Sequence, residues 1–124
     1  MDKTIKKLSL EFCGKGMHKI TVEKLFSAGN ALLLDVRTQP EAKAIKFDFS
    51  HFGIDVLNIP LDQLPERHKE LPTDRLIVTF CSGGTRAAFA YVYLASKGYE
   101  NLRWFDGGYT ELLSYLSPGK FLDK

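Results

Sequence analysis

The sequence predicts an α/β fold with one mostly parallel central sheet of about five strands and helices on both faces. Short apolar segments of strand length alternate with segments whose apolar residues recur at helical spacing, as in strand–helix–strand units. Segments 32–36 and 76–80 are apolar almost throughout, which is typical of central strands that helices cover on both sides. Ligands bind such sheets at the carboxyl ends of the strands, so we expect functional side chains there.

The first elements in chain order are a short strand between Leu8 and Ile20 and a helix that begins after Thr21. The threonine hydroxyl can accept a hydrogen bond from a free N–H group of the first helical turn. Gly29 follows the apolar residues of this helix, and glycine readily takes the left-handed conformation that ends a helix. The central strand at 32–36 comes next.

A second helix is predicted to begin at Thr38, directly after the first central strand. Glu41 stands three residues later, so the two side chains can form a capping box. Pro40 is tolerated in this first turn because the N–H group that it lacks would have had no partner. The remaining elements that we expect are strands at 56–59, 76–80 and 102–105, a looser helical stretch at 61–71 that Pro65 interrupts, and helices at 86–97 and 110–116.

The helix predicted at 86–97 is apolar nearly all round. A helix of this kind is usually buried on most of its surface, so we expect it to be deeply packed, Phe89 included, until Gly98 ends it.

The composition indicates one domain over residues 1–124. The chain has 124 residues, of which 44% are hydrophobic; it can bury a core but is too short for two ordinary domains. Its formal charge of +2 is far from the concentrated positive charge that nucleic acid selects. No stretch approaches the roughly 18 apolar residues of a membrane span. Glu11 interrupts the apolar residues that follow the first lysines, so we expect neither a membrane anchor nor a signal peptide.

The chain has two cysteines, Cys13 and Cys81, in such different settings that we expect no disulfide. A reducing compartment suits such a chain, so we expect a soluble cytoplasmic protein. Combined with His18, His51 or His68, Cys13 lacks the short paired spacings of a structural zinc site, and we expect no metal and no cofactor. Cys13 as a resolving thiol for Cys81 is a further hypothesis, although nothing in the sequence brings the two together.

The loop after strand 76–80 is the main candidate for a reactive site. It reads Cys81-Ser82-Gly83-Gly84-Thr85-Arg86 and leads into the next helix. Gly83 and Gly84 can take positive φ, which lets consecutive N–H groups turn inward and form an anion-binding nest. The helix adds the partial positive charge of its first turn. A thiolate at Cys81 gains hydrogen bonds and dipole attraction that a thiol does not, so we predict that Cys81 is a nucleophile.

Arg86 lies five residues after Cys81. Its fork can therefore reach back over the loop and bind an oxyanion with two hydrogen bonds. The alternative interpretation is a glycine-rich turn with a buried cysteine and a surface arginine. The strand, the glycines, the helix and the arginine together favour a site in which the cysteine and the arginine face one substrate.

The loop Cys81-Ser82-Gly83-Gly84-Thr85-Arg86 resembles the active-site loop of rhodanese domains, which are persulfide-forming sulfurtransferases. Three further segments resemble the family in the same order, namely Leu33-Leu34-Asp35-Val36-Arg37 with Pro40-Glu41, Asn58-Ile59-Pro60-Leu61, and Gly98-Tyr99 with Phe105-Asp106-Gly107-Gly108-Tyr109. The resemblance covers about residues 18–117 and implies a single-domain rhodanese-like fold with a short N-terminal extension and a C-terminal tail.

The resemblance also implies sulfur transfer from thiosulfate, or a similar small anionic donor, to a thiol or protein acceptor. Cys81 would attack the outer sulfur of the donor and become a persulfide as sulfite leaves. The loop amides would hold the anionic sulfur, Arg86 would bind the donor's oxyanion, and Ser82 and Thr85 could add hydroxyl hydrogen bonds. In this family Asp35 and Arg37 look mainly structural; a role of Asp35 as general base is the competing hypothesis.

The segment 42–54 departs from the family pattern. Many members have an acidic-aromatic pair and a Gly-His-Ile element in this region, whereas this chain has a longer aromatic passage with His51 near the position of the family histidine. We expect Phe47, Phe49 and Phe52 to belong to the core or to a loop that covers a sheet edge. Ala87 stands where the family often has a serine.

Two other classes of function remain open. A phosphatase or arsenate reductase of related architecture would use the same cysteine and arginine on a tetrahedral oxyanion, but those enzymes resemble this loop with one further residue between the two. A persulfide carrier or binding module would keep Cys81, present its sulfur to a partner and need little turnover by itself.

Overall fold

Four parallel strands form the sheet of the computed structural model, which describes residues 18–114. They are β1 (Leu32–Asp35), β2 (Asp55–Asn58), β3 (Ile77–Phe80) and β4 (Leu102–Trp104). Their order across the sheet is β2-β1-β3-β4, and every neighbouring pair is parallel. The predicted α/β fold with a parallel sheet is therefore confirmed.

The sheet has four strands, one fewer than the sequence predicts. The fifth is the strand expected between Leu8 and Ile20, most of which lies outside the described residues. Within them, Lys19 forms a single parallel bridge to Trp104, and the N–H of Ile20 donates to the Trp104 carbonyl at 3.2 Å. On the C-terminal side of this bridge the pairing ends because the chain turns into a helix at Val22.

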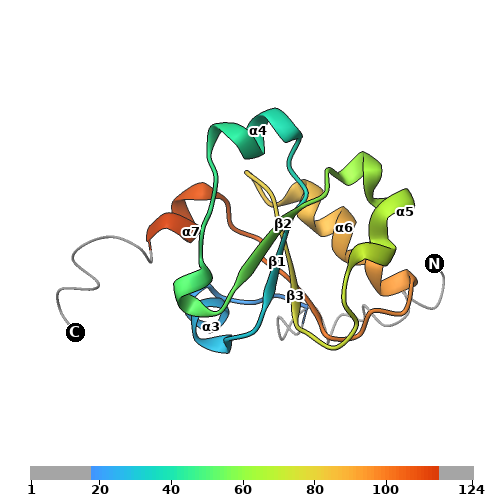
Figure 1. Cartoon of the computed structure of the whole chain (residues 1–124), viewed down its shortest axis with the longest axis horizontal. Helices are drawn as coiled ribbons and strands as arrows, with labels where there is room; N and C mark the ends of the chain where they lie inside the picture. The colour runs from blue at the N-terminus through green and yellow to red at the C-terminus, as the bar shows by residue number, and fades with distance from the viewer. Residues whose placement is uncertain (1–17, 115–124) are drawn as a thin grey trace.

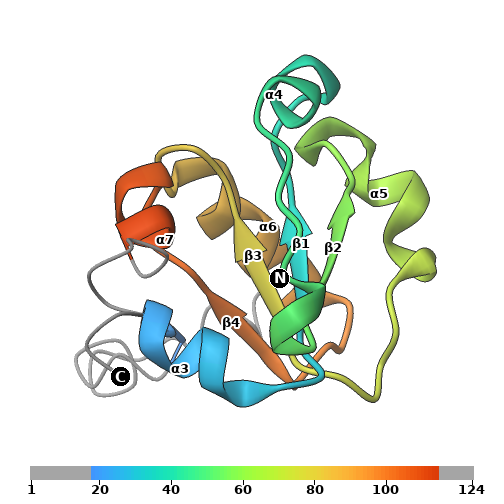
Figure 2. The same cartoon turned by 60° about the vertical axis from the view of Figure 1, so that its left-hand side comes forward.

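Helices cover both faces of the sheet (Figures 1 and 2). One face packs against α5 (Leu64–Arg67) and α6 (Thr85–Ser96), and the other against α3 (Val22–Ala28) and α7 (Tyr109–Ser114). In β1, Leu32 and Leu34 belong to the first of these two cores, and Leu33 belongs to the second. Because successive side chains of a strand point to opposite faces, each central strand contributes to both cores.

The first helix begins and ends, and the second begins, where the sequence predicts. Thr21 accepts a hydrogen bond from an N–H of the first turn of α3 at 3.2 Å, and Gly29 ends that helix with a φ of 61°. At the start of α4 (Gln39–Ala44), Thr38 and Glu41 form the predicted capping box. This short helix lies beyond the carboxyl end of β1, at the top of Figure 1.

Helix α6 is less completely buried than its apolar sequence predicts. Ala87, Ala90 and Leu94 are fully buried, but Phe89 is 64% exposed. A helix on the face of a sheet leaves its opposite side in solvent, so the prediction of deep packing is wrong for Phe89. Gly98, with a φ of 93°, lies just beyond the end of the helix. Within residues 18–114, no helix has both the length and the apolar character needed to cross a membrane.

The helical stretch predicted at 61–71 consists of three short pieces. A 3-10 turn at Leu61–Gln63 leads into α5, and a second 3-10 turn follows at His68–Glu70. Pro65 lies in the first turn of α5, where its missing N–H group leaves no helical hydrogen bond unmade.

The aromatic residues of segment 42–54 pack against the core. Phe49 is 3% exposed, and its ring centroid lies 5.0 Å from that of Phe26 on α3. Phe52 contacts the same ring at 4.8 Å, and Phe47 contacts Phe80 of β3 at 5.4 Å. The expected core role is confirmed for Phe49, while Phe47 and Phe52 are half-buried against the same core.

Candidate active site

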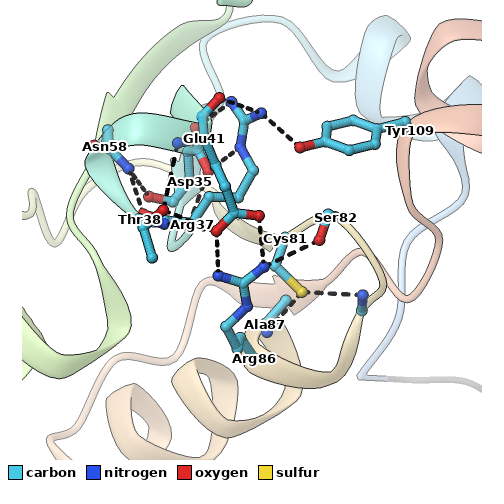
Figure 3. Close-up of polar contacts among 11 residues, drawn as sticks. Asp35, Arg37, Thr38, Glu41, Asn58, Cys81, Ser82, Arg86, Ala87 and Tyr109 are labelled. Atoms are coloured by element: carbon cyan, nitrogen blue, oxygen red, sulfur yellow. Dashed lines mark hydrogen bonds and ion pairs between the residues drawn. The ribbon is translucent and has the colours of Figure 1, made fainter. Parts of the chain in front are cut away.

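Cys81 lies directly after β3, at the carboxyl end of a central strand, and is 1% exposed. Its Sγ accepts hydrogen bonds from the backbone N–H groups of Gly84 at 3.0 Å and Ala87 at 3.4 Å (Figure 3). Two N–H dipoles directed at one atom stabilise negative charge on that atom. The loop therefore supplies two hydrogen-bond donors to the sulfur of Cys81.

The sulfur of Cys81 also caps helix α6. The N-cap residue of this helix is Gly84, which has no side chain that could accept a hydrogen bond. Ala87 is the third residue of the helix, and its N–H is one of the groups that no helical carbonyl reaches. Sγ accepts a hydrogen bond from it, as a serine or aspartate side chain at the N-cap would do. Thr79 of β3 adds a hydroxyl hydrogen bond to the Ala87 carbonyl at 2.9 Å, so helix and strand together position the thiol.

Of the two loop glycines, Gly84 is the one whose position requires glycine. Its φ is 93°, and a Cβ added there would overlap the backbone carbonyl of Asp106. Gly83 does not have a positive φ, and an added Cβ would meet nothing within 4 Å. The expectation that both glycines take positive φ is therefore wrong for Gly83.

The segment after β4 packs tightly against the Cys81 loop. A Cβ added to Gly108 would overlap the carbonyl of Ser82. The indole N–H of Trp104 donates to the carbonyl of Gly84 at 3.0 Å. The last strand and the glycines that follow it thus maintain the shape of a loop that begins more than twenty residues earlier.

Arg86 forms an ion pair with Glu41 of α4 (Figure 3). Its two terminal nitrogens donate to the two carboxylate oxygens at 2.7 and 3.0 Å, and one of them also donates to Ser82 Oγ at 3.0 Å. The hydrogen bonds from Arg86 lower the pKa of Glu41 to about 2, and the hydrogen bonds to Glu41 raise the pKa of Arg86. Each side chain is 33% exposed, so the fork that was expected to bind a substrate oxyanion already holds a carboxylate.

The structure brings together most of the loop residues that the sequence singles out. The N–H of Gly84 donates to Cys81 Sγ, and Arg86 donates to Ser82 Oγ. Thr85, at the first position of α6, and Gly83 are exposed.

Asp35 and Arg37 form a buried ion pair at the end of β1. Arg37 donates to the two carboxylate oxygens at 2.8 and 2.6 Å, and both side chains are at most 2% exposed. Arg37 also donates to the carbonyl of Ile45 at 2.9 Å and to the hydroxyl of Tyr109 at 3.0 Å. Burial lowers the pKa of Arg37. The hydrogen bonds to Asp35 and Tyr109 raise the pKa by more than burial lowers it, so the net shift is upward. The pair joins β1, the end of α4 and the start of α7, as scaffolding residues would.

A recess of about 300 Å³ lies beside Arg86. It is lined by Val36, Thr38, Pro60, Leu61, Asp62 and Arg86. These residues come from the segments that follow β1, β2 and β3, the last being the first turn of α6, so the recess lies at the carboxyl edge of the sheet, where a ligand is expected.

The cysteine and histidine alternatives gain no support from the described residues. Cys13 lies outside them, so its role as a resolving thiol stays a prediction. Across residues 18–114, no group of three or more His, Cys, Asp or Glu side chains is placed to hold a metal ion. His18 packs on the Trp104 ring at 5.5 Å, and its pKa is lowered by burial and by the nearby Lys19.

Sequence reasoning missed three contributions to the site. It assigned Glu41 to a capping box but not to Arg86, and it did not foresee the roles of the Ala87 N–H and the Trp104 indole. An acidic residue in a helix that follows the carboxyl end of a central strand could have indicated a partner for the arginine. The other two contacts depend on backbone and ring orientation, for which the sequence carries no signal.

Comparison with known proteins identifies a family for this combination of fold and loop. Residues 20–114 match the model of the rhodanese-like domain, a range that includes all four strands and the Cys81 loop. A sulfurtransferase of Allochromatium vinosum is 31% identical over 86 residues, which cover 69% of this chain and 75% of that protein.

Solved structures agree with the family match. A single-domain sulfurtransferase of Saccharomyces cerevisiae is 28% identical with a TM-score of 0.59, over 77% of this chain and 87% of that chain. An NAD-dependent persulfide reductase from A. fulgidus is 33% identical with a TM-score of 0.53 over 63% of this chain, which spans only 13% of the reductase. The resemblance inferred from the sequence motifs is confirmed, and the chain belongs to the rhodanese-like domain family.

Proposed function

We propose that the chain is a sulfurtransferase that carries sulfane sulfur as a persulfide on Cys81. The observation that carries the proposal is the pair of N–H groups, of Gly84 and Ala87, directed at Sγ at the start of a 12-residue helix. Such a site stabilises an anionic sulfur, and a persulfide extends that sulfur by one atom. The relatives from A. vinosum and S. cerevisiae, which carry the name sulfurtransferase, support the same reaction class.

In the first half-reaction, the Cys81 thiolate attacks the outer sulfur of thiosulfate or a similar donor. A sulfur–sulfur bond forms to Sγ, the sulfur–sulfur bond of the donor breaks, and sulfite leaves with the electron pair of that bond. The enzyme then holds a persulfide anion in the loop. No external oxidant or reductant is needed, because the sulfur atom is transferred between two sulfur nucleophiles.

In the second half-reaction, a thiophilic acceptor attacks the outer sulfur of the persulfide. The acceptor, a thiol, a protein thiolate or cyanide, forms the new bond to sulfur, and Cys81 leaves as a thiolate ready for the next donor.

Cys81 is a free thiol in the structure. A free reactive thiol suits a reducing compartment, and we infer a cytoplasmic location on that ground.

The residues around the thiol would act through charge and hydrogen bonds. We expect the oxyanion of the donor to replace the Glu41 carboxylate on Arg86. Ser82 Oγ would stay beside the bound oxyanion, because it accepts a hydrogen bond from the same guanidinium. Thr85 is exposed at the start of α6, where its hydroxyl can contact a bound anion.

The test is the mass of the intact protein after treatment with thiosulfate. We expect the reduced protein to gain one sulfur atom, and cyanide or a dithiol to remove it. Cys81→Ser is the matched variant, because a serine oxygen can accept the same two N–H hydrogen bonds but cannot form a persulfide. Cys13→Ser should retain the gain, which assigns the adduct to one of the two cysteines.

Three outcomes would contradict or narrow the proposal. A sulfur adduct that persists in Cys81→Ser would contradict it. Release of phosphate from an aryl phosphate, or reduction of arsenate, without any sulfur adduct would favour the phosphatase and arsenate reductase class. An adduct that passes only to a particular protein, and not to cyanide or a dithiol, would favour the persulfide carrier.

A further inference from the structure

The guanidinium of Arg86 already binds an anion from its own chain. Glu41 presents two carboxylate oxygens to two nitrogens of Arg86, at 2.7 and 3.0 Å (Figure 3). This parallel pairing is the geometry in which arginine binds a carboxylate or a planar face of a tetrahedral oxyanion. A donor oxyanion that uses the same fork must therefore compete with Glu41.

Glu41 is anchored by contacts that do not involve Arg86. Its carboxylate accepts hydrogen bonds from the N–H and the hydroxyl of Thr38, at 3.1 and 3.0 Å. Its backbone carbonyl accepts a hydrogen bond from the buried Arg37 at 3.4 Å. These bonds hold the carboxylate against the fork before any substrate arrives, so the competitor is permanently present.

The recess beside Arg86 adds a second carboxylate and an apolar surface. Asp62 lines the recess together with Val36, Pro60 and Leu61. A compact dianion that approaches Arg86 there meets like charge from two side chains, and the three apolar residues replace none of its water. A donor with a single charge and an apolar body is repelled less and buries apolar surface.

We propose that Glu41 is a specificity-determining residue: it disfavours doubly charged sulfur donors and makes the site selective for singly charged donors with an apolar organic body, such as thiosulfonates. This inference rests on the proposed function. The chemistry is the same for both donors. The Cys81 thiolate takes the outer sulfur, and the sulfur–sulfur bond of the donor breaks with its electron pair on sulfite or on an organic sulfinate.

The first test compares thiosulfate with benzenethiosulfonate in the wild type and in Glu41→Gln. Glutamine keeps the size of the side chain and can still form the capping box with Thr38, but it removes the charge. We expect the wild type to have the higher kcat/KM for benzenethiosulfonate. In Glu41→Gln, kcat/KM for thiosulfate should rise about fivefold, whereas that for benzenethiosulfonate should change by less than about twofold.

Thr38→Ala is the matched control, because it removes the other half of the capping box and leaves the carboxylate charge. It should not raise the ratio of thiosulfate to benzenethiosulfonate activity. An increase of that ratio in both variants would show that loosening of α4, and not the loss of charge, changes the selectivity, and would overturn the proposal.

A second measurement tests the charge effect without sulfur transfer. In a Cys13→Ser background, Cys81 is alkylated with iodoacetate or iodoacetamide, which share a leaving group and differ by one negative charge. We expect Glu41→Gln to raise the ratio of the iodoacetate rate to the iodoacetamide rate by about threefold.

The outcomes separate this inference from the proposed function. Failure of both donors to form an adduct in the wild type would contradict the proposed function, and the alkylation ratio would still decide whether Glu41 excludes anions. Equal loss of activity toward both donors in Glu41→Gln, or an unchanged alkylation ratio, would overturn the role of Glu41 in selectivity.

Discussion

The sulfur of Cys81 accepts a hydrogen bond at 3.4 Å from the N–H of Ala87, the third residue of the helix that follows it. The proposed nucleophile thus serves as the side-chain cap of α6, a task that the N-cap residue Gly84 cannot perform. Under the proposed function, reactivity and local stability depend on the same atom.

This relationship predicts that two inactive variants of Cys81 differ in stability. Cys81→Ser retains an acceptor for the N–H groups of Gly84 and Ala87, whereas Cys81→Ala leaves both buried donors without one. We expect Cys81→Ala to unfold at lower denaturant concentration, with a free energy of unfolding about 1 kcal/mol below that of Cys81→Ser. Equal stability of the two variants would show that the sulfur does not cap the helix.

The two loop glycines should respond differently to alanine. Gly84→Ala places a Cβ against the Asp106 carbonyl at a φ of 93°, so we expect a loss of about 2 kcal/mol or more in the free energy of unfolding. Gly83→Ala adds a methyl group to open space and should change stability by less than about 0.5 kcal/mol. Urea unfolding of both variants measures the contrast, and a large loss in Gly83→Ala would be inconsistent with this loop geometry.

The Glu41–Arg86 pair gives a defined pH dependence. Arg86 lowers the pKa of Glu41 from its ordinary 4.5 to about 2, so the paired carboxylate stabilises the fold above about pH 4.5. That contribution is lost as the pH falls through about 2. Because the pair is 33% exposed, we expect it to contribute no more than about 1 kcal/mol.

The measurement is the difference in unfolding free energy between the wild type and Glu41→Gln as a function of pH. The difference should be constant near neutrality and should shrink between about pH 4.5 and 2. A difference that already disappears near pH 6 would mean that another group is responsible.

The buried Arg37 should be far more important for stability than for chemistry. Arg37→Met leaves the Asp35 carboxylate buried without its partner, and we expect a loss of about 3 kcal/mol or more. Tyr109→Phe removes a single hydrogen bond to the same guanidinium and should lose about 1 kcal/mol. Thermal unfolding compares the two.

Asp35→Asn separates scaffolding from general-base chemistry. We expect it to lower stability, because its carboxylate pairs with Arg37 at 2.6 Å. A fall in turnover with unchanged stability would instead support Asp35 as a general base.

Trp104 should report on the state of the Cys81 loop. It is the single tryptophan of the chain, and its indole N–H bonds to the carbonyl of Gly84, a residue whose N–H holds Sγ. We expect thiosulfate to change the tryptophan fluorescence of the wild type and a dithiol to reverse the change. The same signal in Cys81→Ser would mean that the change does not come from the persulfide.

Much of the fold could be predicted from local patterns in the sequence. Apolar runs at 32–36 and 76–80 predict buried parallel strands, and the Thr38 and Glu41 pair predicts the start of α4, because strand burial and helix capping depend on residues close together in the chain. The count of strands was less predictable, since within residues 18–114 Lys19 makes a single bridge to Trp104 before α3 begins. The exposure of Phe89 likewise depends on which side of α6 meets the sheet.

For Cys81, the sequence by itself determined the local surroundings of the thiol, from which we propose its chemistry. A cysteine between an apolar strand and a glycine-rich helix start has backbone N–H groups as its neighbours in sequence, so the sequence predicts an anion-binding loop there. The fold decided that the N–H of Ala87 reaches Sγ. Only the tertiary structure decided that Arg86 faces Glu41, that Trp104 supports the loop and that Asp62 lines the adjoining recess. Those side chains come from helices, a turn and a strand far apart in the chain, and the packing of the parallel sheet brings them to one edge.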